Sequence, residues 1–156
     1  MSNQQQVDLL KQGTDAWNAW RQEHPTGASD LNEDDLSRLH LSGANLRNAN
    51  LSGAKLNETT LSNADLEYAS LVGADLSKAD LTGANLSGAD LSGALLTEAN
   101  LTAANLSNVV LLDANLSGAT LTQANFSNAD LTGALLKQTD LRDACITPEQ
   151  LAQSRT

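Results

Sequence analysis

Aromatic side chains are nearly missing from this chain. Phe, Trp and Tyr together make up 3% of the 156 residues, although apolar residues as a whole make up 40%. A globular core of this size normally combines large fillers of several shapes. A core that depends on Leu and Ala instead favours a single domain built from many similar layers.

Basic residues and long apolar runs are also scarce. The chain has nine Lys and Arg residues and nineteen Asp and Glu residues, which gives a net charge of −10. This charge argues against nucleic acid or an anionic membrane as the ligand. No apolar run approaches the length of a membrane span. No basic segment followed by an apolar stretch opens the chain, so we expect no secretory signal and a cytoplasmic location.

Reactive groups are few and widely separated. His24 and His40 are the only histidines and Cys145 is the only cysteine, so there is no intrachain disulfide and no zinc-type spacing. There is no phosphate-cradling glycine loop either. Since catalysis needs acid–base or nucleophilic groups held together, we predict that the protein is not an enzyme and has no metal or cofactor. We expect Cys145 to have a packing role.

What the chain has in abundance is a period of five. A leucine, or once Phe and once Ile, recurs every fifth residue from Leu41 to Ile146 without a slip in register. Two residues earlier the chain carries Ala, except at Leu39, Thr59, Val109 and Thr139. A period of five fits neither a helix nor a strand. It fits a short extended piece followed by a turn.

The turn is marked two residues after each leucine. Gly or Asn is frequent there, as in Gly43 and Asn48, and these residues adopt a left-handed backbone at least cost. Several positions break the rule, so we expect other turn types at some corners; among them are Glu58, Tyr68, Lys78, Glu98 and Gln123.

The pattern A-(D/N)-L-x-x, as in residues 49–53 and 84–88, resembles the pentapeptide-repeat family. The resemblance implies an all-β solenoid, a right-handed quadrilateral β-helix with four pentapeptides per coil and inward Leu and Ala. It further implies about five to six coils, or roughly 26 Å at the spacing of hydrogen-bonded strands.

Both ends of the chain are expected to cap the solenoid, because open coil edges invite association. An amphipathic helix is predicted over 4–22, with one apolar face that includes Leu9, Leu10, Trp17 and Trp20. A plug over the first coil and an aromatic ligand platform are the two readings of the tryptophans. A second, short helix is predicted after Thr147-Pro148, which has a capping-box sequence.

These signals predict three segments. Residues 1–28 form an N-terminal capping helix and a breaker. Residues 29–146 form the repeat domain, whose first coil is degenerate. Residues 147–156 form a short C-terminal helical cap and tail.

Residues twenty apart should stack on one face of the solenoid. The face centred on Leu51 and Leu71 then carries an acidic column, Asp90, Asp113 and Asp130, and no Lys or Arg. Some members of the resembled family, including quinolone-resistance proteins, are similar to DNA in shape and charge and bind DNA gyrase. The next face mixes both signs of charge, and no face approaches the charge density of duplex DNA.

Apolar residues also occur where the repeat is normally polar. Leu95, Val110, Leu112 and Leu135 fall on two adjoining faces over neighbouring coils, as expected of a contact patch. Tolerated drift is the alternative reading.

We therefore predict a non-enzymatic scaffold, a protein-interaction module whose partner the sequence does not identify. An acidic DNA mimic that binds DNA gyrase or topoisomerase is the alternative. A monomer is expected, with a dimer through the apolar patch as the other outcome.

Overall fold

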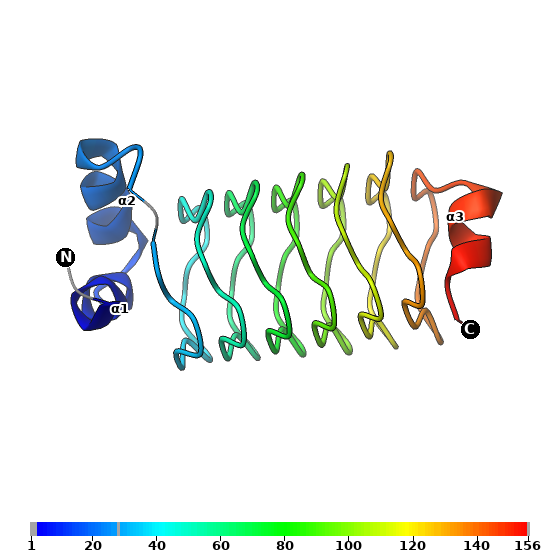
Figure 1. Ribbon diagram of the computed structural model, residues 1–156, viewed down its shortest axis with the longest axis horizontal. Helices are drawn as coiled ribbons and strands as arrows, with labels where there is room; N and C mark the ends of the chain where they lie inside the picture. The colour runs from blue at the N-terminus through cyan, green and yellow to red at the C-terminus, as the bar shows by residue number, and fades with distance from the viewer. Residues whose placement is uncertain (1–2, 28, 156) are drawn as a thin grey trace.

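A computed structural model describes residues 3–27 and 29–155. It contains a tower of stacked coils between two helices at the N-terminal end, α1 (Asn3–Lys11) and α2 (Thr14–Glu23), and one at the C-terminal end, α3 (Pro148–Gln153) (Figure 1). None of these helices is long and apolar enough to cross a membrane, within the part of the chain that is described.

The tower is held by single parallel bridges between residues twenty apart. They run from Asp30↔Asn50 to Asn125↔Cys145, one at every fifth residue. Four pentapeptides therefore complete one coil. Each face is too short for a continuous strand, because a turn interrupts the extended backbone every five residues. We number the faces by their central residues: face 1 holds Leu51 and every twentieth residue from it, and faces 2, 3 and 4 follow from Leu56, Leu61 and Leu66.

Each pentapeptide is tied to the coils above and below it. In the repeat around Leu71, the amide of Leu71 donates to the carbonyl of Asp90 (2.7 Å), and the amide of Ser70 donates to Ala49 in the coil below (2.9 Å). The turn closes on itself through Ala74 N and Leu71 O (3.0 Å). This regular pairing satisfies the main chain along the sides of the tower.

The corner residues are left-handed whatever their side chain. Tyr68 (φ 58°) and Glu98 (φ 59°) adopt nearly the same φ as Gly88 (φ 66°). The same left-handed backbone occurs at Glu58, Lys78 and Gln123. Our expectation of a different backbone at these corners is wrong. The ladder fixes them, as when Tyr68 N donates to Ser87 O (3.0 Å), so tertiary pairing overrides the local preference.

The core is a stack of leucines and alanines. The central residues from Leu31 to Leu131 are essentially buried, with Phe126 filling one leucine position. Each buried leucine contributes about 1.5–3 kcal/mol relative to an exposed one. The stack is less well covered at its C-terminal end, where Leu141 and Ile146 are only partly buried.

The N-terminal segment departs from the prediction of one helix over 4–22. It forms two helices that break at Gly13, whose φ of 121° is outside the helical range. The degenerate first coil is nevertheless in register, since Leu31 and Leu36 are buried and Asp30 begins the ladder.

The C-terminal helix begins with the predicted capping box. Thr147 Oγ1 accepts from Gln150 N (3.2 Å), and Gln150 Oε1 accepts from Thr147 N (2.9 Å). After α3 the chain returns to the tower, where Arg155 forms a bridge with Leu135 and donates from its amide to Ala134 O (2.7 Å).

Candidate protein-interaction surface

One corner of the tower, where face 1 turns into face 2, carries an apolar side chain in each of four successive coils, exposed in three of them and half-buried in the fourth. These are Val72, Leu95, Leu112 and Leu135, which we call the corner ridge. Val72, Leu95 and Leu112 are 40%, 44% and 38% exposed, and Leu135 is half-buried. Among the described residues, the other large apolar side chains that are exposed are Tyr68 and Leu151.

The register explains why the ridge is continuous. Val72 and Leu112 follow the central leucines of face 1, whereas Leu95 and Leu135 precede those of face 2. The bridges place Leu95 beside Asn115 and Asn115 beside Leu135. The apolar side chains thus alternate across the corner as the coils rise.

The corner residues between these side chains are mostly glycines, which have no side chain to project from the tower. In order along the tower they are Gly73, Gly93, Asp113 and Gly133, all left-handed. A Cβ added at Gly73 or Gly93 would meet no atom within 4 Å. A partner surface can therefore approach the main chain closely at these two coils.

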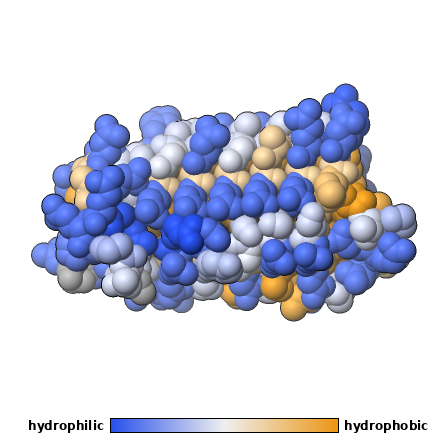
Figure 2. Space-filling view, turned by 90° about the horizontal axis from the view of Figure 1, so that it is seen from above, coloured by the Kyte–Doolittle hydropathy of each residue, from blue (hydrophilic) through white to orange (hydrophobic). Residues whose placement is uncertain are grey.

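Val110, the fourth residue of the predicted patch, lies on face 1 away from this corner and is half-buried. Val72, which belongs to the ridge, was missed by the sequence analysis. The signal was present, since Val72 occupies the same repeat position as Leu112. In Figure 2, lines of hydrophilic side chains along the tower break up the apolar surface of the side in view, which fits small, local apolar areas.

The predicted acidic column is interrupted. Bridges join Asp90 to Val110 and Val110 to Asp130, so a valine separates the two carboxylates. Asp113 lies at the corner instead, where Arg155 donates to its carboxylate (3.1 Å). Asp90 and Asp130 therefore lie across face 1 from the corner ridge, whereas Asp113 lies at the corner itself, and the three acids do not form one line.

Asp90 and Asp130 are held in the same way. Asp90 Oδ1 accepts from the amide (2.9 Å) and hydroxyl (2.6 Å) of Ser92, and Asp130 Oδ1 accepts from the amide (3.0 Å) and hydroxyl (2.6 Å) of Thr132. The Thr132 hydroxyl, followed by its amide, lowers the pKa of Asp130 below its ordinary value. Hydrogen bonds to the charged form keep Asp130 ionised at neutral pH.

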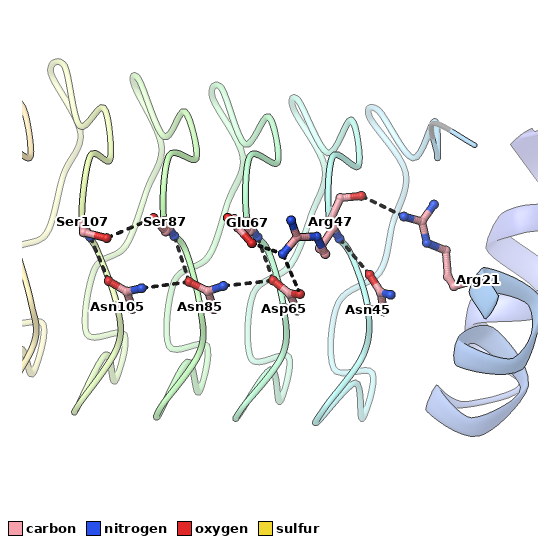
Figure 3. A network of polar contacts seen from close by, with 9 residues as sticks. All are labelled: Arg21, Asn45, Arg47, Asp65, Glu67, Asn85, Ser87, Asn105 and Ser107. Atoms are coloured by element: carbon pink, nitrogen blue, oxygen red, sulfur yellow. Dashed lines mark hydrogen bonds and ion pairs between the residues drawn. The ribbon is translucent and has the colours of Figure 1, made fainter. Parts of the chain in front are cut away.

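Face 4 has a different character, an amide ladder (Figure 3). Asn85 Nδ2 donates to Asp65 Oδ1 (3.2 Å), and Asn105 Nδ2 donates to Asn85 Oδ1 (3.1 Å). Arg47 forms ion pairs with Asp65 and Glu67 at the N-terminal end of this ladder. The polar groups here bond to one another along the face, in contrast to the corner ridge.

The helices at the N-terminal end contact the exposed edge of the first coil. Trp17 is completely buried, and its Nε1 donates to Asn45 O (2.7 Å). Asn18 Oδ1 accepts from Asn45 N (2.8 Å), and Gln6 Oε1 accepts from Asp30 N (3.0 Å). Leu10 is buried, and Leu9 and Trp20 pack partly buried against the same core.

Arg21 was not singled out from the sequence. It is 4% exposed and donates to Gly27 O (2.6 Å), Ser29 Oγ (3.2 Å) and Arg47 O (3.0 Å). Burial lowers the pKa of Arg21. Sequence reasoning had no signal for it, because two of its three acceptors are main-chain carbonyls.

The described part of the chain assembles no group of side chains suited to a metal ion. In residues 3–27 and 29–155, no three His, Cys, Asp or Glu side chains are placed to hold a metal ion together. Cys145 is exposed, which contradicts the expected packing role. It lies in a shallow recess with Ser127, Thr147 and Gln150. The Gln150 amide is already used there, since its Nε2 donates to Phe126 O (2.6 Å) and Ala129 O (3.0 Å).

A ladder of parallel bridges at a spacing of twenty, with leucine and alanine inside and left-handed corners, defines a β-solenoid built from pentapeptides. The model of the family called Pentapeptide repeats matches residues 29–63, 60–97, 99–138 and 111–147. The chain belongs to the pentapeptide-repeat family, which confirms the predicted family. Its relatives imply a right-handed quadrilateral β-helix for the tower.

Solved structures of the family are similar to this chain. A pentapeptide repeat protein from the thylakoid lumen of Arabidopsis thaliana is 33% identical over 78% of this chain and 74% of its own, with a TM-score of 0.40. One from the cyanobacterium Cyanothece 51142 is 29% identical over 88% and 95%, with a TM-score of 0.36.

A trypsin-treated variant of QnrB1, a plasmid-mediated fluoroquinolone resistance protein, is 26% identical over 76% of this chain and 69% of its own, with a TM-score of 0.45. A comparison with curated proteins gave no match.

Proposed function

We propose that this protein is a non-enzymatic scaffold that binds a protein partner through the corner ridge. The observation that supports the proposal is the run of one apolar side chain per coil over four coils, of which three are exposed and Leu135 is half-buried. The fold does not require it, because Asn115 occupies the same column as Leu95 and Leu135. Exposed apolar residues that cluster in this way mark contact surfaces.

The helices at the two ends act as caps in this proposal. Trp17, Asn18 and Gln6 satisfy main-chain groups of the first coil, and Gln150 does the same for Phe126 and Ala129 near the other end. Terminal units of repeat proteins need such covers for solubility. The partner then meets the side of the tower.

The experiment is affinity capture from the native host with three forms of the protein. The wild type is compared with Leu95→Lys/Leu112→Lys. The matched control is Asn63→Lys/Gln123→Lys, which adds the same charge at left-handed corners on another side of the tower. We expect a partner that the wild type and the control retain and the ridge variant loses. Identical captures by all three forms would refute the proposal.

A second candidate, an acidic DNA mimic that acts on DNA gyrase, draws support from the net charge of −10 and from the similarity to QnrB1. It is weakened by the ion pairs on the tower, since Arg38, Lys78 and Arg142 each pair with a carboxylate. A supercoiling assay decides it: this candidate requires a dose-dependent effect of the protein on gyrase, and unchanged supercoiling removes it.

A further inference from the structure

We infer that the corner ridge takes an amphipathic α-helix, aligned with the axis of the tower and basic along the edge that faces face 1. This inference rests on the proposed function and specifies the chemistry of the partner. Four features of the corner point to it: the spacing of the apolar side chains, the pairing of the main chain, the open space at Gly73 and Gly93, and the charges on the two sides.

The spacing matches a helix better than a strand. Coils rise by about 4.8 Å, so four coils place the ridge side chains over about 14 Å. Positions i, i+4, i+7 and i+11 of a helix span about 16 Å at 1.5 Å per residue. Four same-face side chains of a strand span about 20 Å. Only a helix keeps one apolar side chain near each coil.

Most main-chain groups at the ridge are already paired within the tower, although no hydrogen bond within the described part of the chain is made by the amides of Val72 and Leu112. Leu95 N donates to Ala74 O (2.9 Å), Leu95 O accepts from Leu76 N (2.7 Å), and Leu112 O accepts from Gly93 N (2.8 Å). A docked strand would leave most of its own amides and carbonyls unpaired against this surface, which is unfavourable. A helix satisfies its backbone internally and needs only side-chain contacts.

The absence of side chains at part of this corner favours close contact with a docked helix. Gly73 and Gly93 present no side chain, and the space outside them is empty to 4 Å. At these two coils a helix can therefore insert its apolar stripe between Val72 and Leu112 on one side and Leu95 on the other. Further along the corner, towards Leu135, the helix has to pass the Asp113–Arg155 ion pair.

The flanks of the ridge differ in charge. The repeats of face 1 contain no Lys or Arg in the sequence, and Asp90 and Asp130 lie there, with hydrogen bonds from Ser92 and Thr132. On face 2, Lys78 pairs with Glu98 (3.9 Å). Basic residues on the partner therefore belong beside face 1. A second copy of this chain fits poorly, because each carries a net charge of −10 and like charges across an interface repel.

The test uses three labelled synthetic peptides and the full chain. One is a 14-residue helix-forming peptide of Leu and Lys with the apolar residues at helical spacing. The second has Glu in place of every Lys. The third has the composition of the first in strict alternation, which favours a strand. Fluorescence anisotropy at two salt concentrations reports binding.

We expect the Leu/Lys helix to bind the wild type more tightly than either other peptide. Leu95→Ser/Leu112→Ser, which leaves the charge unchanged, should weaken binding by about tenfold or more, since two apolar contacts are lost. Gly93→Asn should weaken it as well by filling the corner, because Asn tolerates a left-handed backbone. The matched control, Gly43→Asn, sits at another corner with equally open space and should bind as the wild type does.

Two results would overturn the inference. One is equal binding of the helical and alternating peptides. The other is equal binding of the Leu/Lys helix to the wild type and to both ridge variants, which would show attraction by net charge alone. If the host partner is lost from Leu95→Lys/Leu112→Lys while no peptide binds, the helical partner is wrong and the interaction surface stands.

Discussion

The guanidinium of Arg21 donates to the main-chain carbonyl of Arg47 across 3.0 Å, and the guanidinium of Arg47 pairs with Asp65 and Glu67 one coil further on. Figure 3 shows Arg21, which belongs to α2, reaching the main chain of Arg47 on the tower, and the Arg47 side chain reaching Asp65 and Glu67. The buried Arg21 thus binds carbonyl and hydroxyl oxygens, while Arg47, on the surface, takes the carboxylates. Arg21 thus fixes the first coil to the helices, and Arg47 fixes the first coil to the second.

Replacing Arg21 should destabilise the N-terminal end. Arg21→Met removes donors from Gly27 O and Arg47 O, and hydrogen bonds to a charged group are worth about 1.5–3 kcal/mol each. We expect a loss of about 2 kcal/mol in the free energy of unfolding, measured by urea denaturation. Arg38→Met, which breaks an exposed pair with Glu58, should change it by less than about 1 kcal/mol. Equal effects would contradict the role given to Arg21.

Gln150 should control the stability of the C-terminal end. Gln150→Ala removes the capping box and both donors from Nε2 to Phe126 O and Ala129 O. The Ala129 carbonyl is then unpaired, at a cost of about 1–3 kcal/mol, whereas Phe126 O still accepts from Ala129 N (2.9 Å). We expect faster amide hydrogen exchange in α3 and in the coil beneath it. Gln153→Ala, at an exposed position of the same helix, should leave exchange in that coil unchanged.

Core leucines should differ according to how well the stack covers them. Leu91 is fully buried, whereas Leu141 near the C-terminal end is only partly buried. Leu91→Ala should therefore cost about 2–5 kcal/mol of unfolding free energy, and Leu141→Ala distinctly less. Urea denaturation of the two variants measures the difference, and a larger loss for Leu141→Ala would contradict the described burial.

The stability of the tower should fall in acid through its hydrogen-bonded aspartates. The pKa of Asp130 is lowered from about 3.8 by the Thr132 hydroxyl and amide. A folded-state pKa below the unfolded value contributes stability above the ordinary carboxyl pKa, and that contribution is lost as the pH falls through the folded-state pKa. Thr132→Val should raise the pKa of Asp130 in an NMR titration. Thr122→Val, whose hydroxyl meets Thr102, should leave it unchanged.

The five-residue period predicted the family, the buried positions and the stacking of columns, because every coil repeats one local solution. The corners at Tyr68 and Glu98 were misjudged because the ladder decides their backbone. The break at Gly13 was missed because the apolar pattern continues across it. In the candidate site, the register located Leu95, Leu112 and Leu135. The role of Arg21 could not be predicted, since its main-chain acceptors do not depend on which residue carries them and so give no signal in the sequence.

Twenty residues per coil make the position of a side chain around the tower depend only on its count along the chain. Inserting one more pentapeptide between Leu95 and Leu112 would turn everything after it by a quarter of a revolution. The hydrophobic interior would be continuous still, yet Leu112 and Leu135 would move to the next corner. A chain built in this way can relocate a binding surface by changing its length alone, without changing a single core residue.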